Sequence, residues 1–342
     1  MTLPYRDISV LPQELHYRMT NTESYSIIKT KTEVFPMKRI PFGSSEKQVS
    51  AVALGCMRLT ALDVQQAARY LNRAVELGID FFDHADIYGG GQCEVLFSQA
   101  LRESGLKRED LWIQSKCAIV PGVMYDFSKE HILASVDGIL KRLNVEYLDS
   151  LLLHRPDLLM EPEEVAAAFD MLEESGKVRH FGVSNHTPGQ ILLLEKCVEQ
   201  PIHVNQLQFG LGHTGMLKSG AECNMATDGA VHRDGEVLNF CRINDITIQT
   251  WSPFQYGMFA GTFLGNPKFP ALNAKIEALA EEYGVSDTAI AAAWILRHPA
   301  KMQLIAGTMN ENRLKDIAAA ADITLTRQQW YELYLAAGNI LP

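Results

Sequence analysis

The sequence lacks the long apolar runs that cross membranes. Its 342 residues are 47% hydrophobic and 21% charged, with a mean hydropathy of -0.05. No segment approaches the roughly 20 consecutive apolar residues that a membrane helix needs. The N-terminus has no apolar h-region, and acidic residues among its first positions argue against a secretory or organellar leader. The composition therefore predicts a soluble, cytoplasmic protein with an ordinary buried core.

Further absences exclude whole classes of function. Basic residues number 31 against 41 acidic ones, and the net charge of -10 repels phosphate backbones and anionic lipid. We therefore expect neither a nucleic-acid nor a membrane partner. The six cysteines form no C-x-x-C pair, and the histidines form no H-x-H or H-E-x-x-H motif, so we expect reduced thiols and no metal. No G-x-G-x-x-G follows the first predicted strand, which disfavours an open nucleotide-binding sheet.

What is present is a repeat of short apolar strands and amphipathic helices, which begins near residue 49 and recurs about eight times. The strands are predicted at 49–54, 79–83, 111–116, 148–154, 178–184, 203–209, 246–251 and 303–306. Helical stripes are predicted at 64–77, 130–143, 162–174, 272–282 and 314–321, with glycines placed where helices should end. Because the strands are apolar on both faces, the pattern favours a (β/α)8 TIM barrel.

The chain is longer than the roughly 250 residues of a bare barrel. We expect a single barrel domain at 37–342 with an N-terminal extension at 1–36, whose segment 24–35 is strand-like. The stretch 210–235 is rich in Gly, Thr, Asn and Asp and predicts a long loop after strand six. Such a loop belongs to the C-terminal face of a barrel, which makes it a candidate substrate lid. The spacing of Trp330, Leu333 and Tyr334 predicts a last helix packed on the outside.

Reactive side chains stand at the ends of three consecutive predicted strands. Asp83 ends the second, Lys116 the third and His154 the fourth, and Tyr88 follows in the string "DHADIYGG". Each has an ordinary structural explanation when taken singly, but the combination has little packing rationale. A buried Lys116 needs an anion, which Asp83 can supply, and the ammonium is expected to lower the pKa of Tyr88. The set predicts a site that protonates the oxygen of a substrate as it becomes an alkoxide. Because the site lacks a nucleophile, we expect the substrate carbon to receive hydride from a bound nicotinamide.

These residues carry a resemblance to the aldo-keto reductases over 37–342. The string "DHADIYG" is similar to that family's Asp-x-Ala-x-x-Tyr-Gly signature, which implies that Asp83, Tyr88, Lys116 and His154 form the catalytic tetrad. The resemblance also implies cofactor contacts from "GVSNH" (Ser184, Asn185), "QLQFGL" (Gln206, Phe209), "WSPFQYG" (Trp251, Ser252, Pro253, Phe254, Gln255, Gly257) and "AGTMNENRLKDI" (Gly307, Thr308, Met309, Arg313). Phe209 is expected to stack on the nicotinamide. We expect His213 and Tyr256 in the substrate pocket.

The function implied is the reversible, NAD(P)H-dependent reduction of an aldehyde or ketone to an alcohol. The guanidinium of Arg313 suits a phosphate, so NADP(H) is preferred. Gly307 stands where some relatives have Lys, which leaves NAD(H) open. One alternative is a cofactor-binding regulatory protein resembling potassium channel β subunits, with little or no turnover. Another is a Schiff-base aldolase using Lys116, against which Asp83 argues because a paired carboxylate keeps the amine charged.

Overall fold

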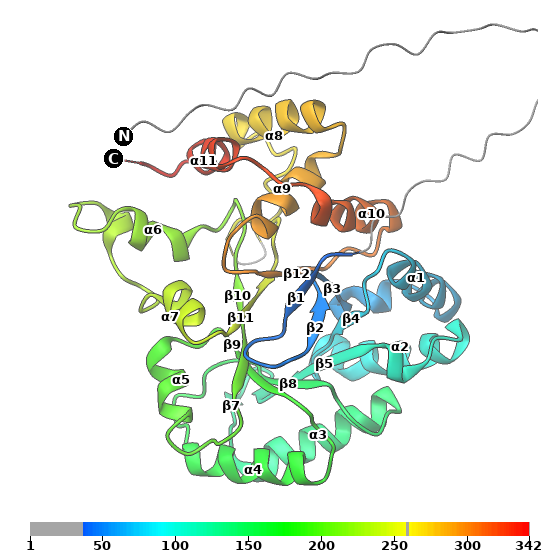
Figure 1. Cartoon of the computed structure of the whole chain (residues 1–342). Coiled ribbons are helices and arrows are strands. Elements are labelled where there is room, and N and C mark those ends of the chain that lie inside the picture. Colours follow the sequence, from blue (N-terminus) through cyan, green and yellow to red (C-terminus); the bar gives the residue numbers. More distant parts are fainter. Residues whose placement is uncertain (1–36, 258–259, 342) are drawn as a thin grey trace, which may run out of the picture. The chain divides into compact units, whose positions relative to one another are not determined.

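The computed structural model describes residues 37–257 and 260–341, and its centre is a closed barrel of eight parallel strands (Figure 1). The strands are β3 (Val52–Gly55), β4 (Phe81–Asp83), β5 (Trp112–Cys117), β8 (Ser150–Leu153), β9 (Phe181–Ser184), β10 (Ile202–Gln208), β11 (Thr247–Trp251) and β12 (Gln303–Ala306). Each pairs with the next in the chain, and β12 pairs with β3 to close the ring. The predicted (β/α)8 barrel is thereby confirmed.

Helices surround this barrel (Figure 1). They are α1 (Val64–Glu76), α2 (Gln92–Ser104), α3 (Lys129–Leu143), α4 (Pro162–Glu174), α5 (Pro188–Leu194), α6 (Gly215–Ala221), α7 (Val237–Ile243), α8 (Pro270–Tyr283), α9 (Asp287–Leu296), α10 (Glu311–Ala319) and α11 (Arg327–Ala336). In α3 the predicted apolar stripe is buried, Ser128 caps the first turn and Asn144 ends the helix in a left-handed conformation. The other four predicted stripes are also helical, at α1, α4, α8 and α10.

The amino end of the barrel is closed by a hairpin that the sequence pattern did not predict. Strands β1 (Arg39–Pro41) and β2 (Gln48–Ser50) pair antiparallel, so Val49 belongs to this hairpin and not to the first barrel strand. Between them Phe42 is fully buried, with its ring centroid 4.5 Å from that of Trp112 and 6.2 Å from that of Phe81. Both partners stand at the first residues of barrel strands, so aromatic packing seals this end.

The spacing of its apolar residues predicts a C-terminal helix on the outside of the barrel, and α11 is that helix, packed on α9. The indole rings of Trp294 and Trp330 stack at 4.8 Å, and each Nε1 donates a 3.0 Å hydrogen bond to the other residue's backbone carbonyl. Both buried indole donors are thereby satisfied.

Three further expectations concern the N-terminal segment, membrane helices and the cysteines. The segment 1–36, including the strand-like 24–35, lies outside the described residues. No helix among residues 37–257 and 260–341 is long and apolar enough to cross a membrane. All six cysteines fall in this part of the chain and are unpaired.

Candidate active site

The four residues of the predicted tetrad stand at one end of the barrel. Asp83 is the last residue of β4, Lys116 is the penultimate residue of β5 and His154 directly follows β8. Tyr88 opens a short 3-10 turn, Tyr88–Gly91, whose three glycines all have positive φ. Because the barrel strands are parallel, their carboxyl ends meet at one rim and bring these side chains to one mouth.

Lys116 lies at the centre of the group and is fully buried. Its Nζ donates hydrogen bonds to Asp83 Oδ2 at 2.8 Å, to the backbone carbonyl of His84 at 2.7 Å and to the Tyr88 hydroxyl at 3.1 Å. All three ammonium protons therefore have an acceptor. Burial acts to lower the pKa of Lys116, but the Asp83 carboxylate and the Tyr88 phenol outweigh it and hold that pKa above its usual value. An amine whose pKa is raised above its usual value argues against the aldolase alternative, which needs a neutral amine.

The phenol of Tyr88 departs from one sequence expectation. Burial raises the pKa of Tyr88, and although the Lys116 ammonium works in the opposite direction, the net shift is upward. The expected lowering of this pKa was wrong, because burial destabilises the phenolate more than the Lys116 ammonium, which Asp83 shares, stabilises it. Tyr88 therefore keeps its proton at neutral pH, which is the state that a general acid requires.

His154 faces Tyr88 across the mouth. The two ring centroids are 6.0 Å apart, and the ring planes are nearly perpendicular at 79°. Burial, followed by the charges of Lys116 and Arg155, holds the pKa of His154 well below its usual value. The imidazole is therefore neutral and can donate one hydrogen bond without adding charge to the site.

A ring of polar residues continues from the tetrad to the next strands. Asn185, which has a positive φ of 59°, donates from Nδ2 to Ser184 Oγ at 2.8 Å. Its Oδ1 accepts a 3.2 Å hydrogen bond from the indole Nε1 of Trp251 at the end of β11. Gln206 points into the barrel and donates to Asp83 Oδ1 at 3.1 Å. The structure thus brings these four predicted residues together beside Asp83.

Phe209 does not belong to this group. Its side chain is fully buried and stacks on Trp294 of α9, with ring centroids 5.3 Å apart. The reason is strand alternation: Gln206 and Gln208 face the barrel interior and mouth, whereas Phe209 follows the opposite face into the helix layer. The expectation that Phe209 stacks on a nicotinamide was wrong. Trp251, half-buried at the mouth, offers the accessible ring.

The loop after β11 packs against the start of the loop after β10. Ser252 adopts a positive φ of 47°, and a side chain at Gly210 would meet the carbonyl oxygen of Pro253 at 2.0 Å, so only glycine permits this approach. Gln208 Nε2 donates to the carbonyl of Gly257 at 3.0 Å. Phe254 and Gln255 are partly buried here, and Tyr256 packs on Phe269 with ring centroids 4.9 Å apart. Residues 258–259 lie outside the described chain.

The segment after β12 carries the remaining predicted contacts and one that the sequence did not suggest. Gly307, Thr308 and Met309 are half-buried, and Arg313 lies exposed in the first turns of α10. Arg58, from the 3-10 helix Cys56–Ala61 that follows β3, donates from Nη1 to the carbonyl of Gly307 at 2.9 Å. A second guanidinium thus reaches this segment. It is 249 positions away in sequence, so no local motif could reveal it.

The predicted loop at 210–235 contains structure of its own. It holds α6 and a 3-10 turn at Asp228–Ala230, and α6 packs beside α7. His213 is exposed in a tight turn, in which its backbone N–H donates to the carbonyl of Gly210 at 2.8 Å. The roles of lid and substrate contact for this loop stay predictions.

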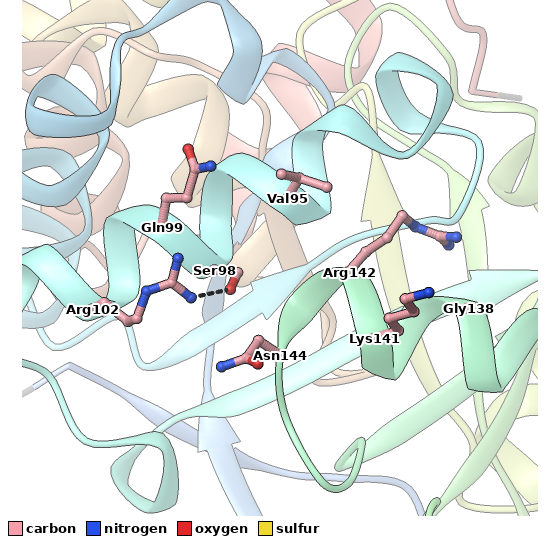
Figure 2. Close-up of a pocket in the computed structure, with 8 residues that line it drawn as sticks. All are labelled: Val95, Ser98, Gln99, Arg102, Gly138, Lys141, Arg142 and Asn144. Carbon is pink, nitrogen blue, oxygen red and sulfur yellow. Dashed lines mark hydrogen bonds between the residues drawn. The ribbon is translucent and has the colours of Figure 1, made fainter.

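A cavity of about 550 Å³ lies elsewhere, on the outer wall between α2 and α3 (Figure 2). Arg102 and Arg142 line it from the two helices, and Arg102 donates to Ser98 Oγ at 2.9 Å. Arg142 also donates from Nε to the fully buried Glu94 at 2.7 Å, and Glu94 accepts from Ser115 Oγ at 2.8 Å. The two arginines that line the cavity therefore hydrogen-bond side chains of α2. The residues that line the cavity are separate from the strand ends that carry the tetrad.

Comparison with known proteins adds independent information. The sequence model described as "Aldo/keto reductase family" matches residues 51–334. An uncharacterised oxidoreductase YcsN of Bacillus subtilis is 34% identical over 313 residues, covering 88% of this chain and 98% of the relative. A 6-dehydroglucose reductase of Agrobacterium fabrum is 32% identical over 315 residues, with the same coverage of each chain. A probable voltage-gated potassium channel subunit beta of rice is 27% identical over 82% of this chain and 90% of its own.

Solved structures share the fold. A thermostable aldo-keto reductase, Tm1743, solved with the inhibitor epalrestat, superposes with a TM-score of 0.70 at 24% identity, covering 88% of this chain and all of its own. A Bombyx mori aldo-keto reductase solved with NADP gives a TM-score of 0.68 at 20% identity, covering 88% of this chain and 93% of its own.

Proposed function

The chain belongs to the aldo/keto reductase family, and from this premise we propose that it reversibly reduces an aldehyde or ketone to an alcohol with NADPH as preferred cofactor. The observation that carries this proposal is the buried Lys116 Nζ, placed 2.8 Å from Asp83 Oδ2 and 3.1 Å from the Tyr88 hydroxyl. This arrangement positions a protonated phenol at the mouth of the barrel, where a carbonyl oxygen can receive its proton.

The residues around the mouth suit a nicotinamide dinucleotide. Trp251 offers a half-buried ring for stacking, and Asn185 and Gln206 offer amides for a carboxamide. Arg58 and Arg313 lie at the segment after β12, where guanidinium groups can pair with a phosphate. This pair favours NADPH, and the glycine at 307 leaves NADH use open. When bound, the reduced cofactor supplies hydride to the carbonyl carbon.

The protein's own groups handle the proton. Tyr88 donates it to the oxygen as negative charge develops there, and the Lys116 ammonium stabilises the phenolate left behind. Asp83 holds Lys116 charged and in place. The neutral imidazole of His154 donates a second hydrogen bond to the substrate oxygen and orients the carbonyl. In the oxidation direction the same groups act in reverse.

The decisive experiment is replacement of Tyr88 by Phe, which removes the hydroxyl and keeps the ring. NADPH oxidation with an aldehyde should fall about 10³-fold, within the range expected for loss of a general acid. NADPH binding, followed by fluorescence, should change little. The carbonyl panel should include 6-dehydroglucose, because a 32% identical relative is named for its reduction. Wild-type rates in the Tyr88→Phe variant would exclude the proposed role.

A second candidate function is suggested by the similarity to the rice channel subunit. In this hypothesis the chain binds NADP(H) as a regulatory protein and turns over little or no substrate. Tight cofactor binding together with no reduction across a broad aldehyde and ketone panel would favour it over the reductase.

A further inference from the structure

The interior of the barrel contains a row of buried glutamines where such barrels usually place aliphatic side chains. They are Gln114 on β5, Gln206 on β10, Gln249 on β11 and Gln303 on β12, each no more than 3% exposed. The row begins at the tetrad, where Asp83 Oδ1 accepts hydrogen bonds from Gln114 Nε2 at 2.7 Å and from Gln206 Nε2 at 3.1 Å.

Gln249 joins the two donors of Asp83. Its Oε1 accepts from Gln114 Nε2 at 2.8 Å and from Gln206 Nε2 at 2.9 Å. Its Nε2 donates to Gln114 Oε1 at 3.1 Å and to Gln303 Oε1 at 2.8 Å. The row ends where Gln303 Nε2 donates to the backbone carbonyl of Ser50, in the hairpin that closes the amino end, at 2.7 Å.

The direction of every amide in this row follows from one charge. An ionised carboxylate only accepts hydrogen bonds, so Gln114 and Gln206 must both turn their NH₂ groups toward Asp83. Their NH₂ groups also face Gln249 Oε1, which forces Gln249 Nε2 toward Gln303 and fixes the orientation of that amide in turn. A flip of any member would oppose two donors or two acceptors in a site without bulk water, which is costly.

We propose that Gln249, through Gln114 and Gln206, is a positioning residue that fixes the Asp83 carboxylate and thereby sets how readily Tyr88 releases its proton. The inference rests on the proposed function only for its catalytic consequence. Two amide donors on Oδ1 spread the negative charge of Asp83 and leave Oδ2 to Lys116. Gln249 Oε1 is the second acceptor of both donors, at 2.8 and 2.9 Å, and so holds their Nε2 groups beside Asp83 Oδ1. When Gln249 is lost, these donors are less well held, the Asp83 charge acts more strongly on the neighbouring ammonium and phenol, and Tyr88 holds its proton more tightly.

The test uses Gln249→Met, which preserves side-chain length and removes all four hydrogen bonds. Thr250→Val is the matched control, because Thr250 is the next buried residue of the same strand and makes one 3.4 Å hydrogen bond, to the Gln303 carbonyl. The readout is the ¹³Cζ resonance of Tyr88, assigned with Tyr88→Phe and followed from neutral pH upward in the full chain. This titration needs neither cofactor nor substrate.

The midpoint of the Tyr88 titration should lie about one pH unit higher in Gln249→Met than in the wild type and in Thr250→Val. A shift of this size is typical when the hydrogen-bond partners of a nearby charge change. Alcohol oxidation, which needs phenolate, should shift to higher pH by the same amount. Titration of this resonance at the same pH in all three proteins contradicts the proposal.

Two further arms keep the outcomes separate. Should Gln249→Met fail to fold, Gln303→Met breaks the row one step farther from Asp83 and should give a smaller shift in the same direction. No shift in a folded Gln303→Met would then count against the proposal. A wild-type chain without reductase activity would overturn the proposed function, whereas the Tyr88 titration would still decide the role of the glutamines.

Discussion

The two ends of the barrel differ in what they bury. The amino end is sealed by aromatic rings, with Phe42 packed on Phe81 and Trp112 beneath a tight hairpin. The carboxyl end encloses the Lys116–Asp83 ion pair completely and holds Asn185 and Ser252 in left-handed conformations. The amino end also has an ion pair, in which the buried Asp149 accepts from Arg108 at 2.7 Å, but that guanidinium is partly open to solvent. Apolar packing stabilises a fold, whereas buried charge and backbone strain lower its stability. The end that we propose performs the chemistry thus has the fully enclosed ion pair, whereas the amino end combines aromatic packing with an ion pair that reaches solvent.

Replacing Lys116 by Met should give the largest effect of any change at the carboxyl end. Hydride transfer should fall by at least about 10³-fold, because Tyr88 loses the charge that stabilises its phenolate. Removing one partner of a buried ion pair should also cost about 3–5 kcal/mol of unfolding free energy, since Asp83 stays buried without its cation. Stopped-flow kinetics and urea denaturation measure the two effects. Retained activity would show that the phenol does not depend on this ammonium.

Replacing Phe42 by Ala tests the opposite end. The loss of a fully buried ring should lower the unfolding free energy by about 3–5 kcal/mol. The rate of hydride transfer in the molecules that remain folded should stay unchanged, because the ring lies at the far end of the strands from Tyr88. A variant with normal stability and slow hydride transfer would reverse the contrast between the two ends.

Asp86, three residues beyond Asp83, provides a pH-dependent test of strain at the carboxyl end. Burial, reinforced by the charge of Glu94, raises the pKa of Asp86 to about 7. The unfolded chain releases this proton near its ordinary pKa of about 4, so the folded state loses stability as pH rises from there to about 7. Above pH 7 the free energy of unfolding of Asp86→Asn should therefore exceed that of the wild type by about 2–4 kcal/mol. This difference should disappear near pH 4. Thermal unfolding at both pH values measures it, and a constant difference would rule out the titration of Asp86 as the cause.

The smallest expected effect separates two aromatic residues near the mouth. Trp251→Leu should weaken NADPH binding about tenfold, because the accessible stacking surface is lost. Phe209→Leu should leave the dissociation constant unchanged and lower stability instead, since that ring packs only inside the helix layer. Fluorescence titration distinguishes the pair. The reverse result would restore Phe209 as the stacking residue.

Much of the fold could be predicted because its signals are local. Apolar runs that end in charged residues mark the barrel strands and the rim at which Asp83, Lys116 and His154 meet. Helix α9 gave no stripe because residues 289–296 are buried on every side. The hairpin at β1 and β2 was missed because each of its strands has three residues, which is too short to show an alternation of apolar and polar side chains.

The site was less predictable where it depends on orientation and distance. The buried glutamines could have been suspected, since Gln114 stands two positions before Lys116 and Gln249 two before Trp251, on the same faces of their strands. Arg58 and Gly307 lie 249 positions apart in sequence, so no local sequence pattern could predict their hydrogen bond. The direction of the Tyr88 pKa depends on the depth of burial, which residue types alone do not reveal.

The placement of the four tryptophans has a practical consequence. Trp112 stands in the amino-end seal, Trp251 lies at the mouth, and Trp294 and Trp330 form the stacked pair that docks the last helix. The four indoles are thus built-in optical probes of three different parts of the molecule. Emission from single-tryptophan variants would report opening of the seal, filling of the mouth and undocking of α11 as separate events.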